Sequence, residues 1–321
     1  MSEMNPPYPI IREKLFTGQV IPFLGSGASL RASCGAWEKC NEENCYFPQK
    51  KCLGHDAPVG ADSCLPKAGE LACYLARRAA FPRDESIELT KVAQYYESVA
   101  VGRPPLNEEL HSIFNQDHQV NSLHTLLAEV QQPLLIVTTN YDDLIEQAFI
   151  KKGIKYHLML HDNNQNTGGY LLIWRYGSKV PEKVLAKTFD IEDEMKTTNA
   201  PIIYKMHGTV NRLDPAKDQY VITENDYIEF LARMTISKAI PHSFFEFSSQ
   251  RHFLFLGYSL NDWNLRVALN RIMKGKTSEQ NIKSWAIQVD PSQLEEKLWA
   301  TRGVQLYNVA LHEFVEKLLQ S

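Results

Sequence analysis

Short and nearly continuous apolar runs are the feature of this sequence that most constrains its fold. Such runs occur near Ile21–Leu24, Leu134–Val137, Ile202–Tyr204, Phe253–Leu256, Trp285–Val289 and Val304–Tyr307. Runs without alternation of apolar and polar residues are typical of strands buried on both faces of a sheet. A sheet of this kind needs helices against both faces, so the sequence predicts an α/β architecture.

The segments between these runs carry helical periodicity. Apolar residues follow the i, i+3, i+4, i+7 spacing at Leu89, Val92, Ala93 and Tyr96, and again at Leu311, Phe314, Val315 and Leu318. Each set forms one apolar stripe that can pack on a sheet. The alternation of strand and helix predicts a Rossmann-like, doubly wound and mostly parallel sheet, in which ligands bind beyond the carboxyl ends of the strands.

The chain of 321 residues is expected to contain a sheet domain split by an inserted lobe. Between the first strand and Leu134 we find only a Cys-rich stretch near 32–66 and helix-like segments near 67–81, 87–101, 106–115 and 121–130. We therefore assign residues 1–31 and 131–321 to the Rossmann-like domain, and 32–130 to an inserted Cys-rich loop and helical lobe. A second insertion, roughly 155–200, is predicted to form a mobile loop or hairpin over the site.

Composition and charge exclude several classes of protein. Apolar residues make up 44% of the chain and charged residues 22%, which excludes a disordered or collagen-like chain. The formal net charge of −4 disfavours tight nonspecific binding to nucleic acid, which depends on phosphate neutralisation. The sequence has neither a signal-peptide pattern nor an apolar stretch approaching the ~20 residues of a membrane helix. We expect a cytoplasmic protein that contacts neither membrane nor nucleic acid directly.

Four motifs follow four of the expected strands. The first strand ends in Gly25-Ser26-Gly27-Ala28-Ser29, where two glycines allow a tight turn and let backbone amides approach an anionic pyrophosphate. This is half of a dinucleotide fingerprint, because Leu30 stands where a third glycine is usual. Taken alone, the segment is equally consistent with a plain glycine turn.

The second motif, Thr138-Thr139-Asn140-Tyr141-Asp142, allows two interpretations. Asn and Asp are favoured at helix N-termini, so the motif could simply cap the helix that follows. In the functional interpretation, the carboxamide of Asn140 and the carboxylate of Asp142 hold a water and the amide of a ligand.

The third and fourth motifs are His207-Gly208 and Gly257-Tyr258-Ser259-Leu260-Asn261-Asp262. A neutral imidazole at a strand end could accept a proton near physiological pH, although a lone loop histidine is more often structural. Ser259 could bond a ribose or phosphate, or merely finish a turn. Because an α/β crevice draws ligand-binding residues from several strand ends, the four motifs together favour one shared site.

These motifs, in this order, resemble the sirtuin superfamily, particularly the bacterial sirtuin-like proteins of anti-phage defence. The resemblance implies that Asn140 and His207 are catalytic and that Asp142 holds a nicotinamide amide. It assigns dinucleotide binding to Gly25, Ser26, Gly27, Ala28, Ser29, Gly257 and Ser259. It also implies an NAD-binding catalytic sheet domain, with Asp290 or Gln288 near the adenosine end.

The positions of the cysteines separate the activities known in this family. Sirtuin-like protein deacylases carry a zinc ribbon with two CxxC pairs after the His-Gly motif, whereas no cysteine follows Cys73 here. The resemblance therefore favours an NAD⁺ glycohydrolase that cleaves NAD to nicotinamide and ADP-ribose. The alternatives are an NAD-dependent deacylase or ADP-ribosyltransferase, and a noncatalytic module that senses NAD or ADP-ribose.

Five cysteines, Cys34, Cys40, Cys45, Cys52 and Cys64, form a cluster without the close C-x₂₋₄-C pair of most zinc sites. We expect a reduced, loop-rich insertion without a metal, since cytosolic thiols are rarely oxidised. Cys73 is expected to pack in a core.

An enzyme that depletes NAD must be held inactive until it is needed. After the helix expected at Leu311–Leu319 the chain stops, so we expect no fused sensor domain. The resemblance implies control by homo-oligomerisation or by a separate regulatory ATPase or Argonaute-type partner.

Overall fold

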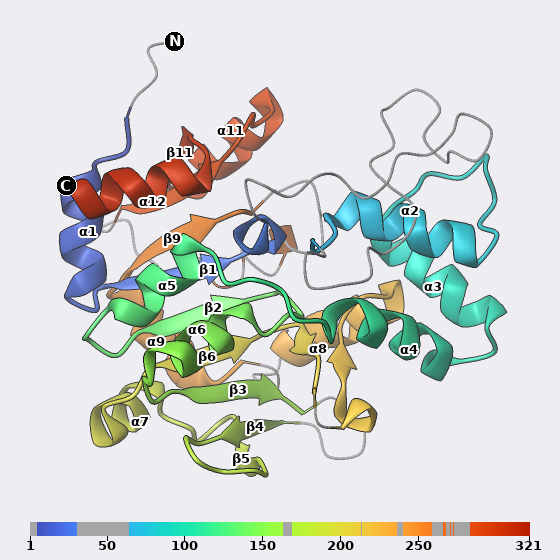
Figure 1. Ribbon diagram of the computed structural model, residues 1–321, viewed down its shortest axis with the longest axis horizontal. Coiled ribbons are helices and arrows are strands. Elements are labelled where there is room, and N and C mark those ends of the chain that lie inside the picture. The colour runs from blue at the N-terminus through green and yellow to red at the C-terminus, as the bar shows by residue number, and fades with distance from the viewer. Residues whose placement is uncertain are drawn as a thin grey trace.

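A nine-stranded mixed sheet forms the centre of the protein, as the computed structural model shows (Figure 1). The structure describes residues 5–30, 64–162, 169–212, 214–235, 240–258, 266–267, 270, 272 and 283–321. The strand order is β11-β10-β9-β1-β2-β6-β3-β4-β5. The strands are β1 (Val20–Leu24), β2 (Leu135–Thr138), β3 (His157–His161), β4 (Tyr170–Trp174), β5 (Glu182–Leu185), β6 (Ile202–Lys205), β9 (His252–Leu256), β10 (Ser284–Gln288) and β11 (Val304–Asn308).

Neighbouring strands pair in parallel from β11 across to β3, and only β4 and β5 run antiparallel to their neighbours. All six strands that the apolar runs predict are present and adjacent in the sheet. The Rossmann-like, mostly parallel fold is thus confirmed. A separate two-stranded ribbon, β7 (Gly208–Thr209) with β8 (Gln219–Tyr220), follows β6.

Alternate residues of each central strand face opposite sides of the sheet, as strand geometry requires. In β1, Ile21 and Phe23 belong to one buried cluster, whereas Val20 and Leu24 belong to another. The strand is continuously apolar because both faces are covered, and each fully buried side chain of this size contributes about 1.5–3 kcal/mol.

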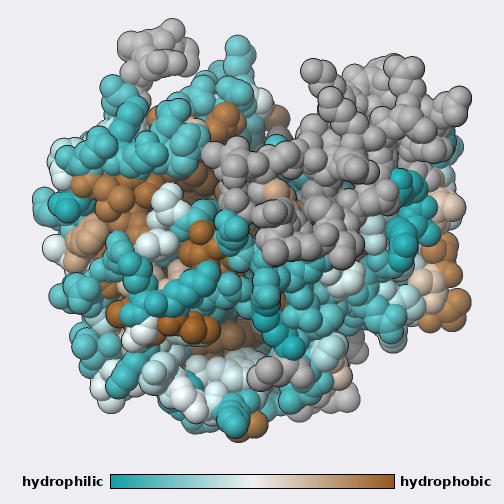
Figure 2. All heavy atoms as spheres, viewed as in Figure 1, coloured by the Kyte–Doolittle hydropathy of each residue, from teal (hydrophilic) through white to brown (hydrophobic). Residues whose placement is uncertain are grey.

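Helices complete both clusters. One face of the sheet is covered by α7 (Ile191–Thr198), α8 (Glu224–Thr235), α9 (His242–Ser249) and α11 (Gln293–Ala300). The other is covered by α1 (Tyr8–Phe16), α5 (Ser122–Glu129), α6 (Leu144–Lys152) and α12 (Leu311–Gln320). Hydrophilic residues cover the outer side of α12 in the view of Figure 2, opposite the apolar stripe that the spacing predicts. Among the described helices, none combines the length and apolarity that crossing a bilayer requires.

Three helices between β1 and β2 form a third cluster beside the sheet: α2 (Ala68–Arg78), α3 (Leu89–Val99) and α4 (Arg103–Phe114). Leu144, Val210 and Ile222, which lie near the carboxyl ends of the strands, join this cluster. The lobe, as we call α2–α4, therefore packs over the edge where the motifs lie. α5 packs instead on the sheet, and the division of the chain into two domains stays a prediction.

The prediction for residues 155–200 is correct in part. β3 and β4 form an antiparallel hairpin, but together with β5 they extend the sheet at one edge (Figure 1), α7 follows them, and no described residue of this segment lines the pocket below. β3 carries a weak sequence signal because it is bounded by two buried histidines, His157 and His161, which leave only three apolar residues in sequence.

Cys64 is the one member of the cysteine cluster that the structure describes, and it is disulfide-bonded. The expectation of reduced thiols is wrong for this residue, because disulfide formation depends on how closely two sulfurs approach in the fold, which sequence spacing does not give. Cys34, Cys40, Cys45 and Cys52 lie outside the described residues. Cys73 is buried in α2, as expected. Within the described ranges, no group of three or more His, Cys, Asp or Glu residues is arranged to hold a metal ion.

Candidate active site

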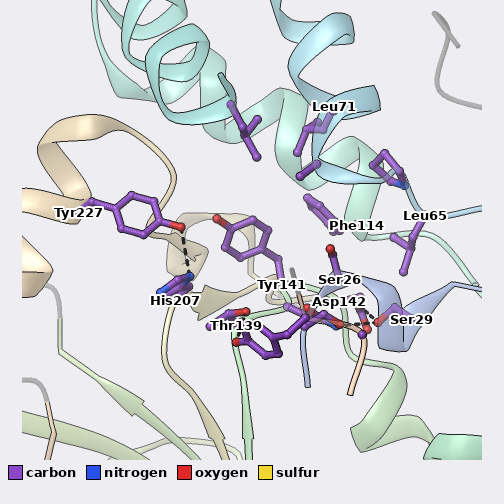
Figure 3. A pocket seen from close by; sticks show the side chains of 18 residues that line it. Ser26, Ser29, Leu65, Leu71, Phe114, Thr139, Tyr141, Asp142, His207 and Tyr227 are labelled. Atoms are coloured by element: carbon purple, nitrogen blue, oxygen red, sulfur yellow. Dashed lines mark hydrogen bonds between the residues drawn. The ribbon is translucent and has the colours of Figure 1, made fainter. Parts of the chain in front are cut away.

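The carboxyl ends of β9, β1, β2 and β6 lie next to one another and border a pocket of about 410 Å³. From these ends come Gly25, Ser26, Ser29, Asn140, Asp142, His207 and Gly257. The lobe and the segment before it supply an apolar wall: Leu65, Leu71, Leu89 and Phe114. Figure 3 shows the two groups facing each other across the pocket. The volume is within the range of small-molecule sites.

Glycines allow two loops to meet at the floor of this pocket. The amide of Gly27 donates to the carbonyl of Gly257, with 3.0 Å between nitrogen and oxygen. Gly257 has φ +67°, and a Cβ there would lie 2.2 Å from the backbone nitrogen of Ala28. Only glycine fits so close an approach, which holds the loop after β1 against the loop after β9.

The carboxamide of Asn140 has a fixed orientation. Its Nδ2 donates to the carbonyl oxygen of Gly25 and to Oγ of Ser29, each at 2.9 Å. Since a carbonyl oxygen can only accept, Nδ2 and Oδ1 cannot exchange places, and both N–H groups are used. Oδ1 is therefore the atom with which Asn140 can accept a hydrogen bond from a water or a ligand hydroxyl.

Asp142 is 5% exposed, and both of its carboxylate oxygens accept hydrogen bonds. Oδ2 accepts from Oγ of Ser29 at 2.8 Å, and Oδ1 from the amide of Leu144 at 3.2 Å. The second bond is a local cap at the start of α6, so the capping interpretation holds for one oxygen. The first bond joins Asp142 through Ser29 to Asn140, so one network fixes the loops after β1 and β2.

His207 is 4% exposed, with its ring edge-on to the rings of Tyr227 and Phe230 at 5.2 and 5.4 Å. Its Nδ1 lies 3.5 Å from the hydroxyl of Tyr227 (Figure 3). Burial, aided by the nearby His161, lowers the pKa of His207 to about 3. The imidazole is therefore neutral, as predicted, but it is a weaker base than the proton acceptor that the sequence predicts. It is better suited to orient a hydroxyl or a water than to take its proton.

Comparison with known families decides the assignment. A family model described as SIR2-like domain matches residues 134–307, more than half of the chain, from just before β2 into β11. The chain belongs to the SIR2-like family. The sirtuin-like resemblance of the chain is thus confirmed, and the matched range includes the second, third and fourth motifs but begins after Gly25–Ser29.

Individual relatives are more distant. The NAD(+) hydrolase ThsA of Acinetobacter baumannii is 29% identical over 196 residues, covering 59% of this chain and 32% of the relative. Defense-associated sirtuin 2 of Bacillus subtilis is 21% identical over 303 residues, covering 94% of this chain and 24% of the relative. A ThsA from Bacillus cereus is 28% identical, covering 60% and 33%. The chain spans about a quarter to a third of the length of these curated relatives.

The pocket brings together most of the residues that the SIR2-like motifs single out, although their roles stay predictions. Ala28 is fully buried in the cluster that α1, α5, α6 and α12 cover, and neither Ala28 nor Gly27 lines the pocket. Ser259 lies outside the described residues. Gln288 bonds Glu295 at 2.8 Å and the amide of Asp290 bonds Asn308, and neither Gln288 nor Asp290 lines the pocket.

Sequence reasoning missed several residues of the pocket. Tyr141 and Tyr258 stand inside the quoted motifs, and their aromatic rings were the available signal. The hydroxyl of Tyr258 lies 2.7 Å from Oγ1 of Thr139, so it ties the fourth motif to the second. Phe114 and Tyr227 lie far from any motif, and only the folded chain brings them to the site.

The lowered pKa values of two buried histidines predict how the stability of the protein depends on pH. Burial lowers the pKa of His124 to about 4 and that of His207 to about 3, from an ordinary 6.5. As the pH is lowered, these histidines take up protons in the unfolded chain before they do so in the folded protein. The free energy of unfolding is therefore highest above about pH 6.5 and decreases as the pH falls toward the folded pKa values. Each histidine should lower the free energy of unfolding by about 2 kcal/mol when the pH falls from 7 to 5.

Urea unfolding of the wild type and His124→Leu at pH 7 and pH 5 measures this effect. The variant should lose about 2 kcal/mol less stability than the wild type across the interval. Equal losses would show that His124 is not held neutral by its surroundings.

Proposed function

We propose that this SIR2-like chain is an NAD⁺ glycohydrolase that cleaves NAD to nicotinamide and ADP-ribose. The observation that carries the proposal is the fixed Asn140 carboxamide in one pocket with neutral His207 and a glycine-lined floor. The activity in the name of the ThsA relatives, NAD(+) hydrolase, supports it.

The chemistry suits these residues. The nicotinamide of NAD⁺ leaves as a neutral molecule, so the site needs no general acid and no pair of carboxylates like that of ordinary glycosidases. It needs a fixed ring, little bulk water, and one water held beneath C1′ of the ribose. Oδ1 of Asn140 can accept a hydrogen bond from that water, and His207 can orient a ribose hydroxyl or the water. The apolar wall of the lobe limits access of bulk water.

The described residues of the pocket could hold a dinucleotide through their own polar groups, with no metal ion required. The loop after β1 borders the pocket through Gly25, Ser26 and Ser29, where it would contact the pyrophosphate. Asp142 would hold the nicotinamide amide with a remaining lone pair of its carboxylate.

We also propose a biological setting for this activity. The name of the B. subtilis relative, Defense-associated sirtuin 2, supports an NAD-depleting effector of anti-phage defence. Such an effector would act in the cytoplasm, and it would be held inactive as a homo-oligomer or by a separate regulatory ATPase or Argonaute-type partner. A size measurement tests the oligomer: a strict monomer that is active without a partner would contradict it.

Incubation of the purified protein with NAD⁺, with and without an acylated peptide, tests the function. Mass spectrometry should detect nicotinamide and ADP-ribose in equal amounts without peptide. Acyl-ADP-ribose that forms only with peptide would instead identify a deacylase, and ADP-ribosylated protein a transferase. Binding of NAD⁺ without turnover would identify a sensor.

A further inference from the structure

A charged lysine lies inside the sheet directly behind the candidate site. Lys205, the last residue of β6, is 0% exposed. Its Nζ donates to Oε1 of Glu146 at 2.9 Å, and the two form an ion pair. It also donates to the main-chain carbonyl oxygen of Asp142.

This ion pair is expected to add little to the stability of the fold. Removing two charges from water costs several kcal/mol, and apolar replacement of such pairs is often neutral or stabilising. Oε2 of Glu146 is buried without a hydrogen-bond partner among the described residues, and burial raises the pKa of this carboxyl. Stability alone therefore gives no reason for a charged residue at position 205.

The second contact of Lys205, with the carbonyl oxygen of Asp142, suggests a reason. Asp142 belongs to the loop that follows β2, and its side chain continues through Ser29 to Asn140. Lys205 itself lies two residues before His207 in the chain. One ammonium group thus connects the strand that carries His207 to the loop that carries Asn140.

We propose that Lys205 is a positioning residue that sets the loop after β2, and with it Asn140, relative to His207. The role rests on the proposed hydrolase function, because only a reaction at this pocket makes that spacing matter. A misplacement of about 1 Å at a reacting group can cost about 100-fold in rate. Without the Nζ donor, the carbonyl of Asp142 loses this bond, and the loop is held less tightly by its remaining bonds, such as that from the amide of Val210 to the carbonyl of Tyr141.

A pair of variants separates this role from stability. The double variant Lys205→Met, Glu146→Met removes both charges together and leaves no buried charge unpaired. Its thermal midpoint should stay close to that of the wild type, while kcat for nicotinamide release falls about 10- to 100-fold and KM changes less. Glu146→Gln is the opposite control: its amide oxygen can still accept from Lys205, so the bond to Asp142 remains and kcat should stay within about threefold, although the unpaired buried ammonium should lower the thermal midpoint.

Amide hydrogen exchange gives a readout that needs no turnover. In the double variant, peptides that contain residues 139–143 should exchange at least about tenfold faster than in the wild type and Glu146→Gln, while peptides from β1 and β9 are unchanged. If the double variant keeps full kcat, or if its loop exchanges at the wild-type rate, the positioning role is wrong. If the wild type releases no nicotinamide, the proposed function fails instead, and the exchange rates alone decide the role of Lys205.

Discussion

Alanine at Asn140 or at His207 is expected to lower the rate of nicotinamide release by about 1,000-fold or more. Positioning a reactant and fixing dipoles at a reacting centre supply most of the rate enhancement in a site without covalent or acid catalysis. Asn140→Ala removes the one carboxamide among the described residues that line the pocket, and His207→Ala removes the neutral ring from the same pocket. Initial rates at saturating NAD⁺, followed by chromatography of nicotinamide, measure both losses.

Folding must be checked separately, since Asn140 makes two hydrogen bonds that each contribute about 1 kcal/mol. A matched pair is available on α4, where Nδ2 of Asn115 lies 2.8 Å from Nε2 of His111 outside the pocket. Asn115→Ala and His111→Ala should stay within about threefold of wild-type turnover. Near-normal turnover by both site variants, in protein that is folded by circular dichroism, would refute the catalytic assignment.

The sheet and the floor of the pocket could be predicted from the sequence because the patterns that indicate them are local. A strand buried on both faces must be apolar at every position, and a loop that approaches another backbone must carry glycine. Both constraints act within a few residues, as in Ile21–Leu24 and in the contact of Gly27 with Gly257. The four motifs could therefore be assigned to one edge of the sheet from the sequence alone.

Features that depend on contacts between distant segments could not be predicted in this way. The weak basicity of His207 comes from burial under α8 and from His161, a residue of a strand that the sequence did not reveal. In the sequence, Lys205 is an ordinary polar residue at the end of an apolar run. Only the fold shows that it is 0% exposed and paired with Glu146. The wall provided by Phe114 requires the packing of the lobe, which no single motif encodes.

Gly257→Ala is expected to cost about 3–5 kcal/mol of folding stability and to abolish detectable binding of NAD⁺. Two effects add. An alanine at φ +67° is strained by about 1 kcal/mol, and its Cβ would also lie 2.2 Å from the nitrogen of Ala28 and 2.4 Å from the carbonyl carbon of Gly27. Because those neighbours are backbone atoms, the overlap can be relieved only by moving the loop after β1 away from β9.

Gly303→Ala separates the two effects. Gly303 has φ +69°, almost the same as Gly257, but no heavy atom lies within 4 Å of the position that its Cβ would occupy. It should therefore lose only about 1 kcal/mol in urea unfolding and bind NAD⁺ like the wild type. The difference between the two variants measures the cost of separating the loops at the floor of the pocket. Equal losses from both, with NAD⁺ binding intact in Gly257→Ala, would mean that the contact between Gly27 and Gly257 is not required for the dinucleotide.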